Sequence, residues 1–219
     1  MTSLHSPLVS EVLEGLYSDA KRTDEVVLPK VFAESKRRGG LFDDSNVVSL
    51  LDDAFIPVSA EVGRLLYMLV RMRRPKIVVE FGASFGLSAI HIAAAIRDNG
   101  EGKLITTELN ANKAARAVEN IKKAGFSDLV EVRQGDAFKT LSDVKKIDFL
   151  MLDGWKGLYL SMLQKLEPAL NHGSPVVADD IKLFPEQLQP YLNYVRRPES
   201  GYTSNELPMD DGLELSLRR

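Results

Sequence analysis

The 219-residue sequence contains no cysteine, three histidines and a single tryptophan. Without cysteine the chain forms no disulfide bond and binds no metal through thiolates, which is in keeping with a reducing compartment. No apolar run approaches the roughly 18 residues that a membrane-spanning helix needs. The segment Met1 to Ser10 has neither the basic start nor the apolar core of a secretion signal. We therefore expect a cytoplasmic protein that has no membrane partner.

The sequence also lacks a strong excess of either charge. Its 28 Lys and Arg residues nearly balance its 31 Asp and Glu residues, and the formal net charge is −3. This balance does not favour a nucleic acid as a partner, because binding to a phosphate backbone requires a basic surface. No repeat, linker or low-complexity tract interrupts the chain, so we expect one domain over residues 1–219.

Apolar stretches alternate with helical patterns five times after residue 76, which predicts an α/β fold whose parallel sheet is covered on both faces. The expected strands are Ile77 to Val79, Lys103 to Thr107, Leu129 to Arg133, Ile147 to Leu152 and Pro175 to Ala178. The last part of the chain differs, because two strand-like segments flank a turn at 208–212. These segments, Tyr202 to Leu207 and Leu213 to Leu217, predict a hairpin that adds an antiparallel pair at one edge of the sheet.

Helical patterns precede the sheet. Pro7 to Asp19 has apolar residues at helical spacing, and a second helical stretch, broken by Pro29, runs to Arg38. The pair Gly39-Gly40 would end this second helix. Ser59 is the expected N-cap of a further helix that leads to the first strand.

The first expected strand leads into the pattern Glu80-x-Gly82-x-x-x-Gly86-x-Ser88. Glycine allows a sharp turn and a close approach of the backbone to a ligand, and the helix that follows presents free N–H groups to an anion. A strand, a glycine turn and a helix in this order are typical of a nucleotide site. The third glycine of the dinucleotide-binding motif is missing. A tight turn without any ligand is the alternative interpretation.

Acidic residues follow all five expected strands. They are Glu80, Glu108, Asp136, Asp153 and the pair Asp179-Asp180. Because the carboxyl ends of parallel strands meet at one edge of a sheet, where ligands bind, these acids would lie together. Glu108 follows the second strand, where related folds place a carboxylate that accepts hydrogen bonds from a ribose. A solvated turn is the alternative, or for Glu108 a favourable charge at the start of the next helix.

Three of these acids form a second group at the ends of the fourth and fifth strands. Asp153, Asp179 and Asp180 would repel one another unless a cation joined them. Carboxylate oxygens without cysteine or histidine favour Mg²⁺, Mn²⁺ or Ca²⁺ over Zn²⁺. Lys156 lies three residues after Asp153 and would reach the same place. Most lysines are surface charges, but a lysine beside a metal can act as a base or orient an oxygen nucleophile.

The residues on either side of these acids are informative too. They read Val-Val-Glu80-Phe-Gly82-Ala-Ser-Phe-Gly86-Leu-Ser88, Thr107-Glu108-Leu-Asn110, Gly135-Asp136-Ala137, Leu152-Asp153-Gly-Trp155-Lys156-Gly-Leu-Tyr159 and Ala178-Asp179-Asp180. Together they resemble the cation-dependent O-methyltransferases, a family that includes the catechol and caffeoyl-CoA O-methyltransferases and bacterial relatives. The similarity covers roughly Val58 to Ile181, and the Leu-Asp-x-Trp-Lys-x-x-Tyr string is its most specific part.

This resemblance implies the Rossmann-like class I fold of the S-adenosylmethionine-dependent methyltransferases, with a seven-stranded, mostly parallel sheet and a C-terminal antiparallel hairpin. It divides the single domain into a helical cap or partner segment at 1–57 and a cofactor- and metal-binding core at 58–219. It also implies a homodimer.

The resemblance further implies that S-adenosylmethionine binds across the ends of the first four strands. The expected cofactor-binding residues are Val58, Glu80, Gly82, Ser84, Ser88, Glu108, Asp136, Ala137 and Asp153. Glu108 would hold the ribose, and Asp136 with Ala137 would lie beside the adenine. Gly82 and Ser88 would line the methionine end.

The same resemblance assigns the chemistry to the second group of acids. Asp153, Asp179 and Asp180 would bind the divalent cation, and Lys156 would be the catalytic residue that takes or orients the hydroxyl proton. The family usually has asparagine at position 180. The extra charge of Asp180 should tighten the binding of a hard cation but reduce the acidity that the cation gives to a bound hydroxyl.

A second departure concerns the acceptor. The glutamate that the catechol enzyme brings from its last segment has no secure match, since only Asn205 and Glu206 fall nearby. We therefore expect an S-adenosylmethionine-dependent O-methyltransferase for a small, catechol-like aromatic hydroxyl compound.

Three alternative functions belong to other classes of protein. A nicotinamide-dependent dehydrogenase would also use a glycine turn and a ribose acid, but the missing third glycine and the acid cluster speak against it. An amino-directed base methyltransferase would carry an Asp-Pro-Pro-Tyr type of sequence after the fourth strand, where Leu152 to Trp155 stands instead. A binding protein that keeps the fold without turnover is the third alternative.

Overall fold

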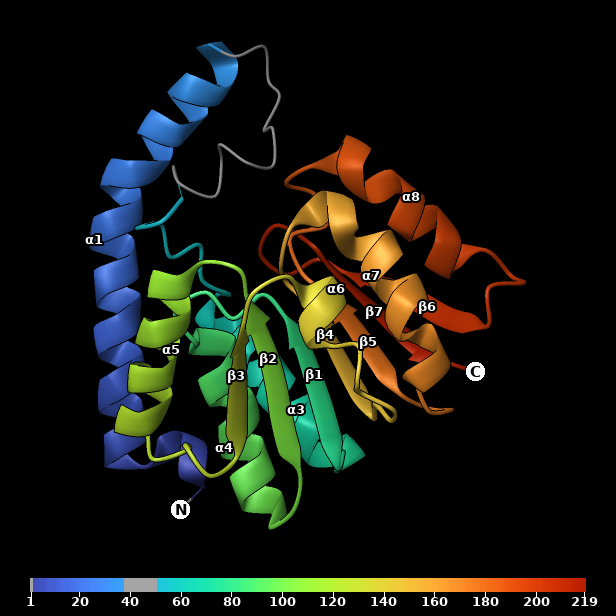
Figure 1. Ribbon diagram of the computed structural model, residues 1–219, viewed down its shortest axis with the longest axis horizontal. Coiled ribbons are helices and arrows are strands. Elements are labelled where there is room, and N and C mark those ends of the chain that lie inside the picture. Colours follow the sequence, from blue (N-terminus) through green and yellow to red (C-terminus); the bar gives the residue numbers. More distant parts are fainter. Residues whose placement is uncertain (1, 38–50) are drawn as a thin grey trace.

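The computed structural model of the protein describes residues 2–37 and 51–219. A seven-stranded sheet lies at its centre, with the order β3-β2-β1-β4-β5-β7-β6 (Figure 1). The strands are β1 (Ile77–Phe81), β2 (Lys103–Glu108), β3 (Val130–Gln134), β4 (Phe149–Leu152), β5 (Pro175–Ala178), β6 (Tyr202–Leu207) and β7 (Leu213–Arg218).

Strands β1 to β5 pair in parallel, whereas β7 runs antiparallel to both β5 and β6. Leu152 at the end of β4 lies beside Phe81 of β1 and Ala178 of β5. The carboxyl ends of the parallel strands therefore meet at one edge of the sheet. The predicted α/β fold with a C-terminal antiparallel hairpin is confirmed.

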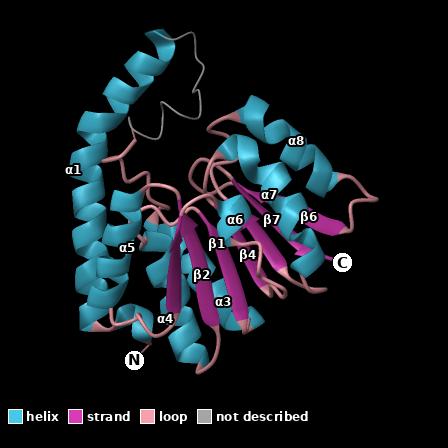
Figure 2. Ribbon diagram, in the orientation of Figure 1, coloured by secondary structure: helices cyan, strands magenta, loops and turns pink. Residues whose placement is uncertain are grey.

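Helices cover both faces of this sheet (Figure 2). The α-helices are α1 (Pro7–Arg37), α3 (Ala60–Arg73), α4 (Leu87–Asn99), α5 (Ala111–Lys123), α6 (Ala137–Thr140), α7 (Tyr159–Leu166) and α8 (Pro185–Arg196). Short 3-10 helices span Ser3–His5, Lys156–Leu158 and Glu167–Ala169. One face packs against α3, α4 and α5, with α1 outside them, and the other face packs against α6, α7 and α8.

Alternating side chains of each strand supply the two halves of the core. In β4, Phe149 and Met151 belong to the apolar cluster with α1, α3 and α4, whereas Leu150 and Leu152 belong to the cluster with α7 and α8. Because β4 is buried on both faces, its sequence reads as a continuous apolar run. This central strand leads directly into the acidic group after Leu152.

Local capping residues begin the helices that flank the sheet. Ser59 accepts a hydrogen bond from the N–H of Val62 at the start of α3. Asn110 accepts hydrogen bonds from the N–H groups of Asn112 and Lys113 at the start of α5. The N-cap predicted at Ser59 is thus confirmed.

The prediction of two N-terminal helices, the second of them broken at Pro29, is wrong. Helix α1 is continuous over 31 residues, and Pro29 lies inside it. A proline removes one backbone hydrogen bond, but the turn beyond it is held in place because Val31 packs into the protein and is 4% exposed. The predicted end at Arg38 and Gly39-Gly40 lies outside the described residues. No helix within 2–37 and 51–219 is long and apolar enough to cross a membrane.

The sequence patterns predict no helix between the fifth strand and the hairpin, yet α8 occupies this place. Two prolines conceal it, Pro185 in its first turn and Pro190 inside it. Its buried residues are Leu188, Tyr191, Leu192 and Val195. Their helical spacing is the signal that was available in the sequence.

Candidate active site

The glycine turn between β1 and α4 touches the turn that follows β4. Gly82 has φ +103°, and a Cβ atom at this position would lie 2.6 Å from the carbonyl oxygen of Asp153. Gly86 also has a positive φ and caps the N-terminus of α4. A side chain at residue 82 would force the two turns apart, so this position requires glycine for its conformation and for its contact.

Glu108 at the end of β2 is held over the same turn. Its carboxylate accepts the backbone N–H groups of Ser84 at 2.8 Å and of Asn110 at 2.9 Å. Ser84 itself has φ +45°. Because each carboxylate oxygen can accept more than one hydrogen bond, Glu108 can also accept a hydroxyl of a ligand. The structure thus brings Ser84 and Glu108 together, as the sequence predicts.

Glu80 lies beneath the turn as a fully buried carboxyl group. Its Oε2 accepts the Thr106 hydroxyl at 2.5 Å, whereas Oε1 has no hydrogen-bond partner of good geometry among the described residues. Burial raises the pKa of Glu80 to about 7, and the nearby hydroxyls of Ser88 and Thr106 offset only part of this rise. A buried carboxyl group with a raised pKa therefore lies directly beneath the glycine turn.

The end of β3 lies beside the end of β2. Asp136 is exposed and caps α6 by accepting the N–H of Phe138 at 2.9 Å, while Ala137 is buried. The N–H of Gly135 donates to the carbonyl oxygen of Glu108 at 2.8 Å. This bond places Asp136 and Ala137 at the edge of the sheet that carries Glu108.

Lys156 is the centre of a buried polar cluster after β4. Its ammonium lies 2.8 Å from Oδ2 of Asp180 and 3.2 Å from Oδ1 of Asp153. It also donates to Oη of Tyr159 at 2.9 Å, and this hydroxyl donates to the carbonyl oxygen of Asp179 at 3.1 Å. The lysine side chain is 9% exposed. Lys156 therefore ties together the loops that follow β4 and β5.

The protonation of this cluster reflects its burial. Burial lowers the pKa of Lys156, but Tyr159, Asp153 and Asp180 outweigh that effect and hold the pKa well above its usual value. Burial raises the pKa of Asp153 to about 7 and that of Asp179 to about 8, and the neighbouring carboxylates add to both increases. The cluster thus has more carboxyl groups than positive charge to balance them.

The predicted metal ligands lie close to one another, but their side chains do not have the geometry of a metal site. Within the described part of the chain, no three Asp, Glu, His or Cys side chains are arranged to hold a metal ion. The ammonium of Lys156 pairs with both Asp153 and Asp180. The donor set of three carboxyl groups, with an excess of negative charge, fits a hard divalent cation in its chemistry.

The hairpin turn supports the loop that carries Asp180. Asp180 has φ +57°, a left-handed conformation that aspartate and asparagine adopt more readily than most other residues. Its N–H donates to Oδ1 of Asp179 at 3.0 Å. The next residue, Ile181, donates its N–H to the carbonyl oxygen of Gly212 at 2.9 Å. The two acids are therefore anchored from the C-terminal hairpin.

The two hairpin residues considered for the missing glutamate have other partners. Glu206 pairs with Lys182 at 2.8 Å and with Arg196 at 3.1 Å. The side chain of Asn205 donates to the carbonyl oxygen of Glu206 at 3.0 Å. These contacts hold the Glu206 side chain between Lys182 and α8, and the Asn205 side chain against its own strand.

The segment before α3 forms a wall of the site. A narrow cavity lies between Ile56 and Val58 on one side and Ser84, Ser88 and Asp153 on the other. It brings four predicted cofactor-binding residues together. Ile56 was not predicted, because an isolated isoleucine in an irregular segment gives no chemical signal.

Tyr159 ends the Leu-Asp-x-Trp-Lys-x-x-Tyr string, but no role in the site was predicted for it. It is fully buried, and its ring meets that of Tyr191 edge-on at 5.8 Å. The available signal is its position three residues after Lys156, which places both on neighbouring turns of one helical segment. Its hydroxyl fixes the direction of the lysine.

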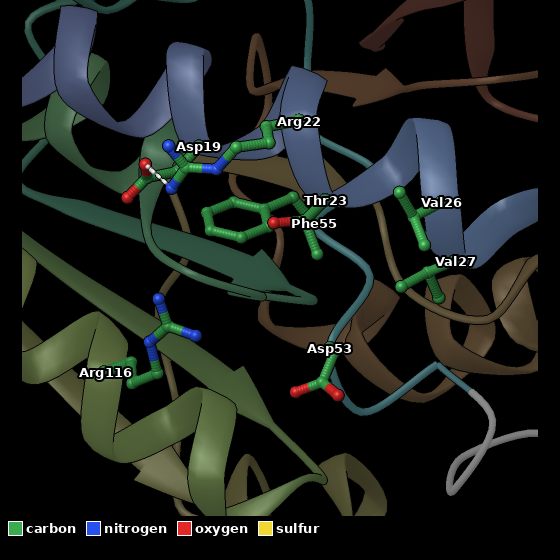
Figure 3. Close-up of a pocket in the computed structure, with 8 residues that line it drawn as sticks. All are labelled: Asp19, Arg22, Thr23, Val26, Val27, Asp53, Phe55 and Arg116. Carbon is green, nitrogen blue, oxygen red and sulfur yellow. Dashed lines mark hydrogen bonds and ion pairs between the residues drawn. The ribbon is translucent and has the colours of Figure 1, made fainter.

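A larger cavity of about 350 Å³ lies on the other side of the 53–55 segment, between α1 and α5 (Figure 3). Phe55 lines it and stacks on Phe85, with the ring centroids 3.9 Å apart. The guanidinium of Arg116 lies 4.4 Å from the Phe85 centroid, and Arg22 pairs with Asp19 at 2.8 Å. The segment that walls the narrow cavity therefore borders this second cavity too.

Comparisons with known proteins point to one family. A methyltransferase domain family matches residues 79–181. Catechol O-methyltransferase of Sus scrofa is 32% identical over 132 residues, which cover 57% of this chain and 70% of that protein. Caffeoyl-CoA O-methyltransferase 1 of Eucalyptus globulus is 26% identical over 184 residues, which cover 73% of this chain and 74% of that protein.

A solved structure shares the fold. The crystal structure of an O-methyltransferase from Streptomyces achromogenes in complex with SAM superposes with a TM-score of 0.68. The superposition covers 92% of this chain and 96% of the Streptomyces achromogenes chain, and the two sequences are 23% identical. At this identity the likeness concerns the fold.

Proposed function

The chain belongs to the family of the cation-dependent O-methyltransferases, and we propose that it moves a methyl group from S-adenosylmethionine to a hydroxyl of a small, catechol-like aromatic compound with the help of a divalent cation. The names of the catechol and caffeoyl-CoA relatives support this acceptor class. The observation that carries the proposal is the buried ammonium of Lys156 between Asp153 and Asp180, beside the glycine turn.

S-adenosylmethionine supplies an electrophilic methyl group on a sulfonium centre. Glu108 would accept hydrogen bonds from the ribose, and Asp136 with Ala137 would border the adenine. Glu80 supports the fit, because its Oε1 is buried without a partner in the described chain. Gly82 supports it as well, because any side chain there would fill the turn.

The methionine end of the donor would lie along the narrow cavity. Val58, Ser84 and Ser88 line that cavity together with Asp153. Closure by these residues would exclude water from the reacting atoms, which protects the methyl group from transfer to water.

A bound divalent cation lowers the pKa of a coordinated hydroxyl and fixes the orientation of neighbouring oxygens. Asp153, Asp179 and Asp180 would hold it through carboxylate oxygens, and Mg²⁺ is the expected ion, with Mn²⁺ or Ca²⁺ as alternatives. Their burial and mutual repulsion favour an added positive charge.

Lys156 would orient the acceptor hydroxyl through Nζ, and it could take the hydroxyl proton only after losing the proton that its raised pKa retains. Its hydrogen bonds to Asp180, Asp153 and Tyr159 fix the position of the nitrogen. An acceptor oxygen that replaces one of these partners would be held at hydrogen-bond distance from Nζ, which is the geometry that general acid–base catalysis requires.

The test is a methyl-transfer assay on catechol, caffeate and a flavonoid, with Mg²⁺ or with EDTA. We expect transfer to depend on Mg²⁺ and to fall by about 10²-fold or more in Asp179→Ala and in Lys156→Ala. Asp128→Ala is the matched control, because Asp128 is an exposed carboxylate that pairs with Arg97 at 2.5 Å, away from the site.

The outcomes separate the parts of the proposal. Full activity in EDTA and in Asp179→Ala would remove the cation from it. Lys156→Ala with wild-type kcat at every pH would remove the role of the lysine. A protein that binds S-adenosylhomocysteine but methylates none of the acceptors would be a binding protein of this fold. We also propose a homodimer, which sedimentation equilibrium tests directly.

A further inference from the structure

A carboxylate of α1 reaches the wall of the site. Asp24 accepts the backbone N–H of Phe55 at 2.7 Å through Oδ1 and the N–H of Ile56 at 2.9 Å through Oδ2. These bonds join residues that are more than 30 positions apart in the sequence. Hydrogen bonds from two successive amides to one carboxylate fix the direction of the backbone between them.

The backbone that Asp24 holds is in an uncommon conformation. Ile56 has φ +41°. A branched side chain at Cβ makes a positive φ unfavourable, and the following proline, Pro57, restricts the residue further. Such a conformation persists only where the surrounding structure imposes it, and it is found most often at functional sites.

The segment is also fixed on the side that faces the glycine turn. The hydroxyl of Ser84 donates to the carbonyl oxygen of Phe55 at 2.8 Å. The Phe55 ring stacks on Phe85, which belongs to the same turn. Phe55 and Ile56 are thus held from α1 on one side and from the glycine turn on the other.

This double attachment determines what borders the reacting groups. Ile56, Val58 and Asp153 line the same narrow cavity. Ile56 remains 38% exposed and shares the lining of this cavity with Asp153. A shift of this backbone would change the space next to Asp153 without any change in the acidic cluster itself.

We propose that Asp24 is a positioning residue for methyl transfer, which holds Ile56 against the site and thereby sets how the acceptor lies over Asp153. This inference rests on the proposed function, since it concerns the acceptor of that reaction. Asp24 acts through the backbone of Phe55 and Ile56 and does not itself contact the predicted donor residues or the acidic cluster.

The decisive variant is Asp24→Asn. Asparagine keeps the size of the side chain but replaces one acceptor oxygen with an N–H₂ donor, which cannot bond to a backbone N–H. With catechol as the acceptor, we expect kcat/KM to fall about tenfold or more, because a small misplacement of a positioning element has a large effect on transfer. The dissociation constant of S-adenosylhomocysteine should change less than about threefold, because Val58 is the one predicted donor residue in the 55–58 segment, whereas Glu80, Gly82 and Glu108 lie outside it.

The matched control is Asp19→Asn on the same helix. Asp19 pairs only with the exposed Arg22 in the described chain, so this variant should keep the wild-type kcat/KM. Both variants are assayed at a temperature at which circular dichroism shows them fully folded. Catechol kcat/KM within twofold of wild type in Asp24→Asn would overturn the inference, and so would a parallel loss of S-adenosylhomocysteine affinity.

A double-mutant cycle tests the route through Ile56. Ile56→Gly removes the side chain and accepts a positive φ without strain. If Asp24 acts by holding Ile56, adding Asp24→Asn to Ile56→Gly should lower kcat/KM by less than about twofold. A full tenfold additional loss would show that Asp24 acts by another route.

Amide hydrogen exchange separates this inference from the proposed function. In Asp24→Asn the amides of Phe55 and Ile56 should exchange at least about tenfold faster, while those of β1 keep their rates. If the wild-type protein methylates no acceptor, the proposed function fails, and exchange alone then decides: faster exchange at both amides supports the positioning role, and unchanged exchange overturns it.

Discussion

The histidine on α4 makes a quantitative prediction about stability. His91 is 3% exposed and lies between α1 and α3. Its Nε2 is 3.3 Å from Oη of Tyr17, and a Cβ atom at Gly63 would lie 2.4 Å from Nε2. Its Nδ1 has no partner among the described residues. Burial, with a smaller effect of the positive charge of Arg64, lowers the pKa of His91 to about 4.

The sign of the effect follows from proton binding. Between pH 6.5 and pH 4 the unfolded chain protonates His91 and the folded protein does not, so the free energy of unfolding decreases as the pH falls through this window. The separation of the two pKa values corresponds to about 3 kcal/mol in full, and to about 2 kcal/mol between pH 7 and pH 5. Above pH 7 the contribution is constant.

The assay is urea unfolding at pH 7 and pH 5, followed by circular dichroism and by the fluorescence of the single tryptophan, Trp155. Other groups titrate as well, and the buried Glu80 acts in the opposite direction because its pKa is raised. The comparison is therefore with His91→Gln, which cannot titrate and keeps an amide near Tyr17. We expect the wild-type protein to lose about 2 kcal/mol more than the variant between the two pH values. Equal losses in both proteins would refute the reasoning.

Two further substitutions test other parts of the fold. Gly82→Ala should abolish S-adenosylhomocysteine binding in calorimetry, because the new Cβ would lie 2.6 Å from the carbonyl oxygen of Asp153 at φ +103°; retained affinity would contradict the close packing of the two turns. Arg196→Met should lower the free energy of unfolding by about 3 kcal/mol, because Glu214 is fully buried and would lose its cation. Adding Glu214→Gln to Arg196→Met should recover part of this loss, and a double variant as unstable as the single one would count against the buried charge as the cause.

Much of the fold can be predicted from the spacing of apolar residues along the sequence and from the composition of each segment. The strands β1, β4 and β5 are apolar throughout because both faces are covered, and this made them visible in the sequence. Helix α1 was misjudged at Pro29 because the contact that holds the next turn, through Val31, comes from tertiary structure. Helix α8 was missed because its two prolines are a stronger local signal than the spacing of its buried residues.

The site also has one part that could be predicted from the sequence and one part that could not. A parallel sheet brings the ends of its strands together, so Glu108, Asp153 and Asp179 could be assigned to one edge from the sequence alone. The ion pairs of Lys156 with two acids depend on the loops after β4 and β5, and their geometry has no signature in spacing. Asp24 was beyond sequence reasoning, because its partners are two backbone amides more than 30 residues away.

The contact between Gly82 and Asp153 constrains how this enzyme could change its acceptor. With no side chain between the two turns, a shift of the β4 loop to admit a larger molecule would displace the β1 turn by the same amount, and cofactor affinity would suffer with it. Changes in acceptor range therefore have to arise elsewhere. They can come from the side chain at residue 56, which can be exchanged without moving the backbone that the glycine turn holds, or from the hairpin turn. For directed evolution, libraries at these two places should yield new acceptors, whereas libraries at residues 153–156 should mostly yield inactive protein.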